Sequence, residues 1–86
     1  MKKRRVYVAY RDIMMKKGGK VYESVELCVS YDEFECEDVI FNASLRLSQH
    51  DRECSDMYVA WYDLDCNPGE TALAAYNRAW AEGRVF

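Results

Sequence analysis

Two groups of side chains in this 86-residue sequence are of types that perform chemistry: cysteines with one histidine, and closely spaced carboxylates. The cysteines and the histidine are Cys28, Cys36, Cys54, Cys66 and His50. Structural zinc sites usually take their ligands from close pairs such as CxxC, and no such pair occurs here. His50 lies four residues before Cys54 in a charged loop, where nothing preorganises a nucleophile and its base. We therefore expect no metal site and no cysteine-based catalysis.

The nearest approach to a catalytic pair of acids is Asp63-Leu64-Asp65. Residues two apart on a strand project to the same side at a separation of about 7 Å, and with Glu70 they would suit a divalent cation. The interpretation we favour is solvated charge at a junction between a strand and a helix. Motifs such as GxSxG, the P-loop, GxGxxG and HExxH are missing. The sequence predicts a protein that is not an enzyme and has no cofactor.

Length and composition restrict the class of protein. Residues 1–86 make one domain, and a composition that is 50% hydrophobic and 14% aromatic is too rich for disorder. No apolar run approaches the roughly 20 residues of a membrane span. The basic segment 1–5 looks like the start of a signal peptide, but Tyr10, Arg11 and Asp12 interrupt the apolar stretch that follows. We expect a cytoplasmic protein with reduced thiols.

The strongest local signal is an N-terminal β-hairpin. Two β-rich stretches, Arg4–Met15 and Lys20–Tyr31, flank a pair of adjacent glycines that suits a two-residue turn. With Gly18 and Gly19 as the loop, the numbers of paired residues sum to 37. This register matches apolar residues on one face of the sheet and complementary charges on the other, as stable ladders prefer.

Particular pairs follow from that register. Val8 faces Val29 on the apolar side, where Tyr10 faces Leu27, and Arg11 faces Glu26 on the other side. Near the turn the match weakens, because Asp12 would share the apolar side with Val25. We expect a β-bulge at that point.

Two further strands and one helix complete the predicted fold. Residues 38–48 alternate between apolar and polar side chains, which predicts a third strand, whereas the polar stretch 49–56 predicts a loop. Residues 57–65 are apolar on both faces, which predicts a fourth strand in a central or covered position. The prediction is an α+β fold: a four-stranded antiparallel meander with a single C-terminal α-helix on one face.

The C-terminal helix is marked at both ends. Asn67, followed by proline, is a favoured N-cap, and Gly83 suits the residue just after a helix. Between them Leu73, Tyr76 and Trp80 recur at helical spacing. We expect this stripe to dock on the sheet.

Charge is unevenly distributed along the chain. Residues 1–20 contain eight Lys or Arg and one acid, whereas residues 21–70 contain thirteen acids and two arginines. The hairpin register would neutralise part of this difference through three pairs, which are Arg5–Asp32, Arg4–Glu33 and Lys2–Glu35. The surplus acids fall at two ends of the predicted sheet, roughly 25–30 Å apart. Those at one end are Glu35, Glu37, Asp38, Asp63 and Asp65, and those at the other are Asp51, Glu53 and Asp56.

An acidic surface on a small, motif-free domain predicts an inhibitor that blocks a basic, nucleic-acid-binding site on a partner protein as a DNA mimic. Phage-encoded anti-CRISPR and anti-restriction proteins act in this way. The other interpretation of these acids is that they lie in ordinary solvated loops. An alternative is a nucleic-acid binder that stacks bases on an aromatic sheet face formed by Tyr7, Tyr22 and Trp61. Arg11 would lie on the same face, and Lys16, Lys17 and Lys20 would hold phosphates. A third possibility is a homodimer that pairs through the sheet face or an open edge strand.

Overall fold

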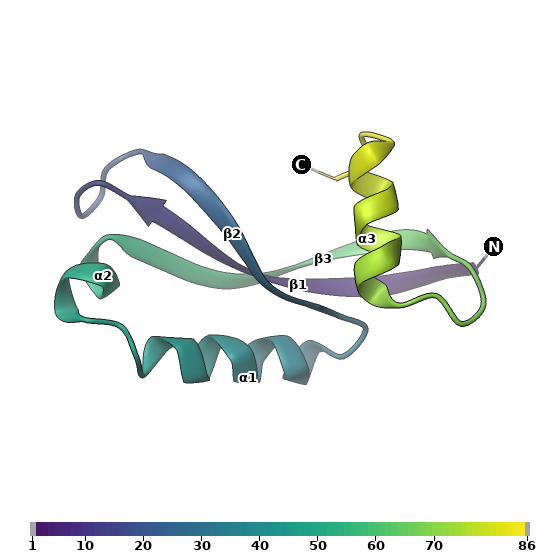
Figure 1. Ribbon diagram of the computed structural model, residues 1–86, viewed down its shortest axis with the longest axis horizontal. Coiled ribbons are helices and arrows are strands. Elements are labelled where there is room, and N and C mark those ends of the chain that lie inside the picture. Colours follow the sequence, from purple (N-terminus) through teal and green to yellow (C-terminus); the bar gives the residue numbers. More distant parts are fainter. Residues whose placement is uncertain (1, 86) are drawn as a thin grey trace.

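The long strand β1 (Lys2–Met14) is the centre of the fold. In the computed structural model, which describes residues 2–85, β1 lies between β2 (Val21–Ser30) and β3 (Ser55–Cys66), antiparallel to both (Figure 1). The predicted α+β class and antiparallel sheet are confirmed. The sheet described here has three strands rather than four, and β3 is an edge strand rather than a central one.

The predicted third strand at 38–48 is wrong, because this part of the chain forms the helix α1 (Glu33–Ser44). Asp32 is its N-cap, and the side chain accepts a hydrogen bond from the backbone N–H of Phe34 at 2.9 Å. Glu33 and Glu35 lie in the first turn, where negative charge is favourable to the helix dipole. The acidic residues 32–38 therefore cap and begin a helix.

The alternation that suggested a strand has a helical explanation. At 100° per residue, positions two apart lie on nearly opposite sides of a helix and positions four apart lie on the same side. Val39 and Ala43 are half-buried, whereas Phe41 and Leu45 are exposed. The helix thus has two apolar sides, and only one of them packs on the sheet.

The predicted loop at 49–56 contains the short helix α2 (Gln49–Glu53). Its N-cap, Ser48, accepts a hydrogen bond from the backbone N–H of Asp51 at 3.2 Å. The chain then enters β3, which pairs with β1 along its whole length from Cys66 opposite Lys2 onward.

The C-terminal helix α3 (Ala72–Ala81) begins later than predicted. Its N-cap is Thr71, whose hydroxyl accepts from the backbone N–H of Ala74 at 3.1 Å, and not Asn67. Asn67 instead belongs to a turn closed by the backbone N–H of Glu70 on its carbonyl oxygen. Gly83 follows the helix with a φ of +73°, which confirms the predicted stop signal. Within residues 2–85, no helix combines the length and the apolar character of a membrane span.

The helix α3 docks through alanines and one tyrosine. Tyr76 is buried as predicted, but Leu73 and Trp80 are 53% and 50% exposed, so their predicted burial is wrong. The buried side of α3 is formed, together with Tyr76, by its small residues Ala72, Ala75 and Ala79. It packs on a core that contains Val6, Val8, Tyr10, Leu64 and Val85.

The hairpin register is confirmed only up to a β-bulge. Val8 lies opposite Val29 as predicted, but the register shifts between Ala9 and Tyr10. Tyr10 therefore lies opposite Glu26 rather than Leu27. This shift comes before the predicted position at Asp12, and it moves Glu26 to the face of the sheet that α3 covers. A second shift follows between Ile13 and Met14. The predicted two-residue loop of Gly18 and Gly19 is wrong, because β1 ends at Met14 and β2 begins only at Val21.

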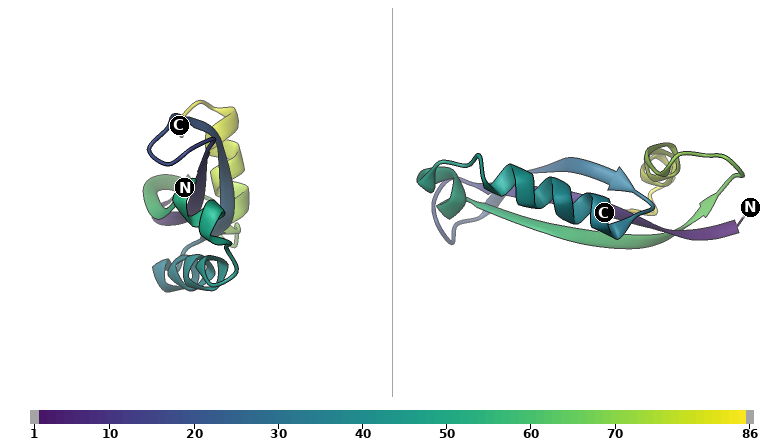
Figure 2. Two further views of the ribbon diagram at one scale, coloured as in Figure 1. Left: turned by 90° about the vertical axis from the view of Figure 1, so that its left-hand side faces the viewer. Right: turned by 90° about the horizontal axis from the view of Figure 1, so that it is seen from below.

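The two long helices lie on opposite faces of the sheet (Figures 1 and 2). Val6, Val8 and Tyr10 share one face of β1 and pack with α3. Side chains of a strand alternate between faces, so Tyr7 and its partner Ser30 point the other way, and Ser30 hydrogen-bonds to Glu35 of α1. The whole body measures 44 × 25 × 14 Å.

Candidate protein-interaction surface

The outer side of α1 carries an exposed apolar stripe, which we define as Phe34, Phe41 and Leu45. These side chains are 74%, 63% and 63% exposed. Their spacing of seven and then four residues places them on one side of the helix. Single exposed apolar residues are ordinary on a protein surface, but three aligned on one helix mark a candidate contact site.

The opposite side of α1 is anchored in the fold. Cys36 is fully buried, and its Sγ lies 3.4 Å from the carbonyl oxygen of Tyr7. Burial raises the pKa of the Cys36 thiol to about 12, so the group stays protonated and acts as a donor. Ser30 adds a second anchor, because its hydroxyl donates to Glu35 at 3.0 Å and accepts from the backbone N–H of Asp32. The helix is held firmly while its outer stripe stays exposed.

Negative charge is concentrated around this helix. We call residues 32–56, which contain α1 and α2, the acidic helical layer. It contains eight carboxylates and only two basic residues, Arg46 and Arg52, for a net charge of −6 against −3 for the whole chain. The rest of the chain is therefore +3. Within the described residues 2–85, none of these eight carboxylates takes part in an ion pair.

The predicted ion pairs between the basic N-terminal residues and the acids at 32–35 are wrong. None of the pairs Arg5–Asp32, Arg4–Glu33 and Lys2–Glu35 is present in the described structure. The pairing of β2 with β1 begins only at Tyr7, so the basic start of β1 projects past β2 and meets β3. The acidic helical layer receives no charge compensation from it.

The basic N-terminal residues instead neutralise the acids at the far end of β3. Arg5 lies 3.5 Å from Asp63, and Lys3 lies 3.8 Å from Asp65, which also pairs with Arg84 at 3.1 Å. These contacts leave neither carboxylate available for a metal ion, and among residues 2–85 no metal-binding cluster of His, Cys, Asp or Glu is present.

The structure redistributes the eight predicted acidic residues into three places. Glu35, Glu37 and Asp38 lie on α1, Asp51 and Glu53 on α2, and Asp56, Asp63 and Asp65 on β3. Those on α2 and at the start of β3 lie at the Gly18 end of the sheet, as predicted, where Glu53 and Asp56 share a hollow with Lys17. The predicted two-ended arrangement is therefore replaced by one continuous acidic layer and a separate, neutralised pair.

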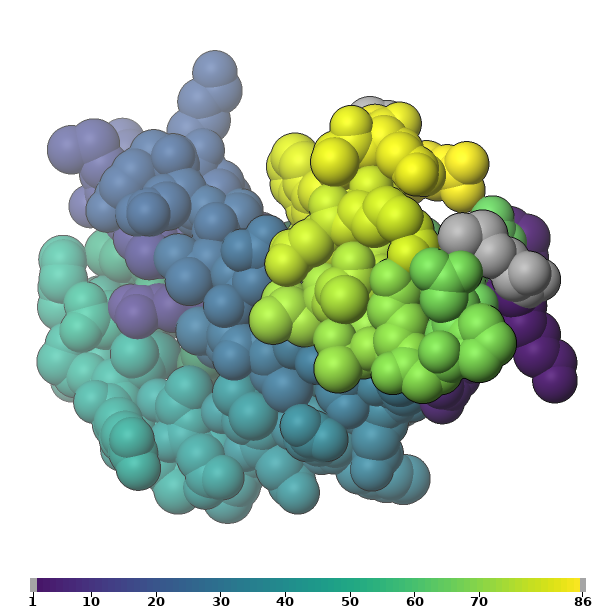
Figure 3. Space-filling model, turned by 45° about the vertical axis from the view of Figure 1, so that its right-hand side comes forward, coloured from purple at the N-terminus to yellow at the C-terminus, as the bar shows by residue number. Residues whose placement is uncertain are grey.

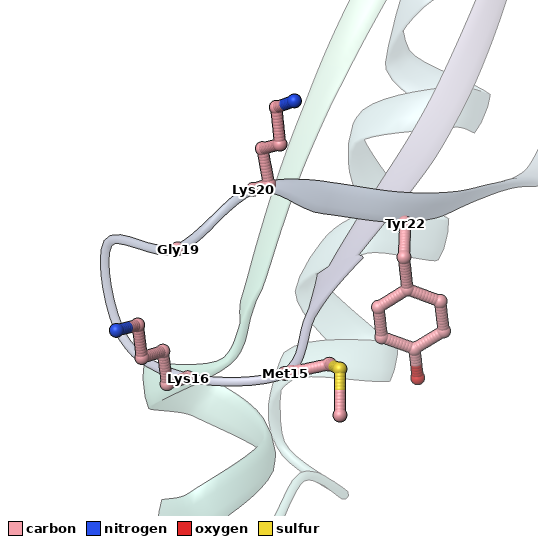
Figure 4. Close-up of a pocket in the computed structure, with 5 residues that line it drawn as sticks. All are labelled: Met15, Lys16, Gly19, Lys20 and Tyr22. Atoms are coloured by element: carbon pink, nitrogen blue, oxygen red, sulfur yellow. The ribbon is translucent and has the colours of Figure 1, made fainter.

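The predicted aromatic face is divided. Tyr7 and Trp61 are partners in the β1–β3 ladder, and the Arg5 guanidinium stacks 3.9 Å from the centre of the Trp61 ring. Tyr22 lies at the hairpin tip, where Met14 is paired with Val21, about 20 Å from Tyr7 at the rise of a strand. It lines a shallow hollow with Met15 and two lysines (Figure 4). These three aromatic residues do not form one base-stacking surface.

Sequence reasoning missed the apolar stripe itself. Its signal was present in the spacing of Phe34, Phe41 and Leu45, but the strand interpretation placed Phe41 and Leu45 on the apolar face of a strand. Comparison of the chain with protein-family models, curated proteins and solved structures finds no match. The assignment of this surface therefore rests on its geometry and charge.

Proposed function

We propose that this protein is a non-enzymatic, cytoplasmic interaction domain that docks its acidic helical layer on the basic, nucleic-acid-binding surface of a partner protein and blocks that surface. The observation that carries the proposal is the combination on α1 of an exposed apolar stripe with unpaired carboxylates. Inhibitors that phages and mobile elements direct against CRISPR or restriction complexes act on partners of this kind.

Each part of the surface has a distinct role in such a complex. Unpaired carboxylates attract a basic partner and speed its association. Burial of exposed aromatic and aliphatic side chains stabilises the complex, by roughly 1.5–3 kcal/mol for each side chain fully removed from water. A surface that only kept the protein soluble would not need Phe34 and Phe41 outside.

The dimensions also fit a competitor of duplex DNA. The helix α1 has 12 residues and is about 18 Å long at 1.5 Å per residue, which is the axial length of about five base pairs at roughly 3.4 Å each. The layer itself would repel nucleic acid, and a second copy of the chain that paired symmetrically through the same layer would bring a net charge of −6 against it. A basic protein is therefore the occupant that the charge favours.

A displacement assay tests this function. Proteins from a bacterial lysate are loaded on immobilised duplex DNA, and purified protein is added at micromolar concentration. We expect the release of a specific DNA-bound protein by wild type, and much less release by the double variant Glu37→Lys/Asp38→Lys. Both residues are exposed and lie beyond the first helical turn, so the change should leave α1 folded.

A matched control variant makes the same change in net charge at residues outside the acidic helical layer. Glu23→Lys/Glu82→Lys also moves the chain from −3 to +1, and both residues are exposed. Wild type and control should release the same protein equally. Equal release by the α1 variant would contradict the proposal, as would direct binding of the wild-type protein to the DNA in a mobility-shift experiment, which would favour the nucleic-acid-binding alternative.

A further inference from the structure

A second candidate site lies on the face of the sheet opposite α1. It is a notch of about 340 Å³ between the hairpin and α3, visible between the β2 and α3 surfaces in Figure 3. The residues that line it are Tyr10, Ser24, Glu26, Tyr58 and Trp80. We call it the Tyr58–Trp80 notch.

Three aromatic rings form its walls. Tyr10 and Tyr58 are partners in the β1–β3 ladder, with ring centres 5.5 Å apart. Trp80 comes from α3 and is fixed in position, because its indole N–H donates to the buried Tyr76 hydroxyl at 2.7 Å. Tyr58 and Trp80 remain 42% and 50% exposed, so their rings are open to a ligand.

The β-bulge after Ala9 brings a carboxylate to this aromatic notch. Without the shift Glu26 would lie on the other face of the sheet, whereas in the structure it lies opposite Tyr10. One of its oxygens, Oε1, accepts from the Tyr76 hydroxyl at 3.1 Å. This contact holds the carboxylate in place and leaves lone pairs on both oxygens for a further donor.

Additional negative charge at the rim has no counter-ion. Asp12 accepts hydrogen bonds from the hydroxyls of Ser24 and Tyr58, both of which line the notch. Asp12 also lies opposite Asp56 in the β1–β3 ladder, and like charges in that position destabilise a sheet. Neither Glu26 nor these two aspartates forms an ion pair with any residue between 2 and 85. Such an arrangement favours the binding of a cation.

We propose that the Tyr58–Trp80 notch binds a guanidinium group, supplied by an arginine side chain of another protein. A guanidinium is planar, stacks on aromatic faces and donates two parallel hydrogen bonds to a carboxylate. Glu26 is the carboxylate, and Tyr58 and Trp80 are the stacking surfaces. A metal ion would need several oxygen ligands around it, whereas rings form most of this wall. The site is independent of the function proposed for α1.

Fluorescence of Trp80 provides the measurement. The chain contains two tryptophans, and Trp61→Phe on the other face leaves Trp80 as the single reporter. We expect saturable quenching by the capped peptide acetyl-Gly-Arg-Gly-amide and none by the same peptide with citrulline, which has the same shape without the charge. Equal responses to the two peptides, or no response to the arginine peptide, would overturn the proposal.

Variants of the notch separate recognition from folding. Glu26→Gln keeps an acceptor for Tyr76 but removes the charge, and should weaken arginine-peptide binding at least fivefold. The matched control is Glu23→Gln, an exposed residue of the same strand that does not line the notch. Tyr58→Leu removes an exposed ring and should also weaken binding at least fivefold. Unchanged binding in both notch variants would overturn the assignment, and tighter binding of free arginine than of the peptide would assign the notch to a small molecule instead of a protein.

Discussion

Tyr76 connects α3 to the hairpin through a single hydroxyl, so Tyr76→Phe is a sharp test of how the fold is held together. This hydroxyl accepts from the Trp80 indole at 2.7 Å, lies 2.8 Å from the Tyr10 hydroxyl and donates to Glu26 at 3.1 Å. The Tyr62 hydroxyl lies 3.0 Å from the Tyr10 hydroxyl and forms the other end of this row of hydrogen bonds. Since Glu26 can only accept, the donors run in one direction, from Tyr62 through Tyr10 and Tyr76 to Glu26.

The expected loss follows from which partners water can replace. Trp80 and Glu26 are exposed and regain a bond to water, whereas Tyr10 is 8% exposed and keeps only its bond with Tyr62. A net hydrogen bond contributes about 0.5–1.5 kcal/mol, and one to a charged group such as Glu26 about 1.5–3 kcal/mol. We expect Tyr76→Phe to lower the free energy of unfolding by about 2 kcal/mol, which corresponds to roughly 8–16 °C in a domain of this size.

The control is Tyr62→Phe, which removes only the half-buried hydrogen bond between Tyr62 and Tyr10. It should lower the free energy of unfolding by about 0.5–1 kcal/mol. Urea and thermal unfolding followed by circular dichroism provide both values. If Tyr76→Phe costs no more than Tyr62→Phe, the directed chain of hydroxyls does not contribute as described. A double-mutant cycle between Tyr10→Phe and Tyr76→Phe should give a coupling energy above about 0.5 kcal/mol.

Three further predictions concern stability. Trp80→Ala should cost about 1–2 kcal/mol in urea unfolding, less than the roughly 3–5 kcal/mol of a fully buried tryptophan, because half of the side chain is exposed; a loss above about 3 kcal/mol would mean that Trp80 is buried in solution. Burial raises the pKa values of Tyr10, Tyr58 and Tyr76, so the stability they contribute is complete below roughly pH 10, the ordinary tyrosine pKa, and is lost as the pH rises further. A melting temperature that stays constant from pH 9 to 11 would contradict this. A chelator and mild reductant should leave the melting temperature unchanged, because the four cysteines are free thiols and buried Cys36 has a raised pKa; stoichiometric zinc in an elemental analysis would show the opposite.

The sequence predicted those parts of the fold that depend on local signals. The hairpin and the glycine that ends α3 follow from turn chemistry, and the register far from the turn, where Val8 lies opposite Val29, follows from the matching of apolar side chains. The helix α1 was not predicted because two apolar sides of a helix produce alternation, which is also the signal of a strand. The half-exposed position of Trp80 was not predictable either, because the alanines on an adjacent side of α3 pack against the sheet in its place.

The candidate sites were predicted only in part. The acids of the helical layer were identified from charge, but their separation from the basic N-terminus depends on β1 pairing with β3, which local sequence does not specify. The position of the β-bulge decides on which face Glu26 lies, and a shift of one residue reverses that choice. Both sites therefore depend on long-range pairing.

The association rate constant of the partner is the most direct measure of the central claim. The protein released from DNA by wild type is immobilised, and the binding of wild type, Glu37→Lys/Asp38→Lys and Glu23→Lys/Glu82→Lys is followed at about 50 and 300 mM salt, where the Debye length falls from roughly 14 to 6 Å. If α1 docks on a basic surface, the α1 variant associates at least tenfold more slowly than the control at low salt, and the difference narrows at high salt. Equal association rates of the two variants at both salt concentrations would contradict the claim that the acidic helical layer is the docking surface.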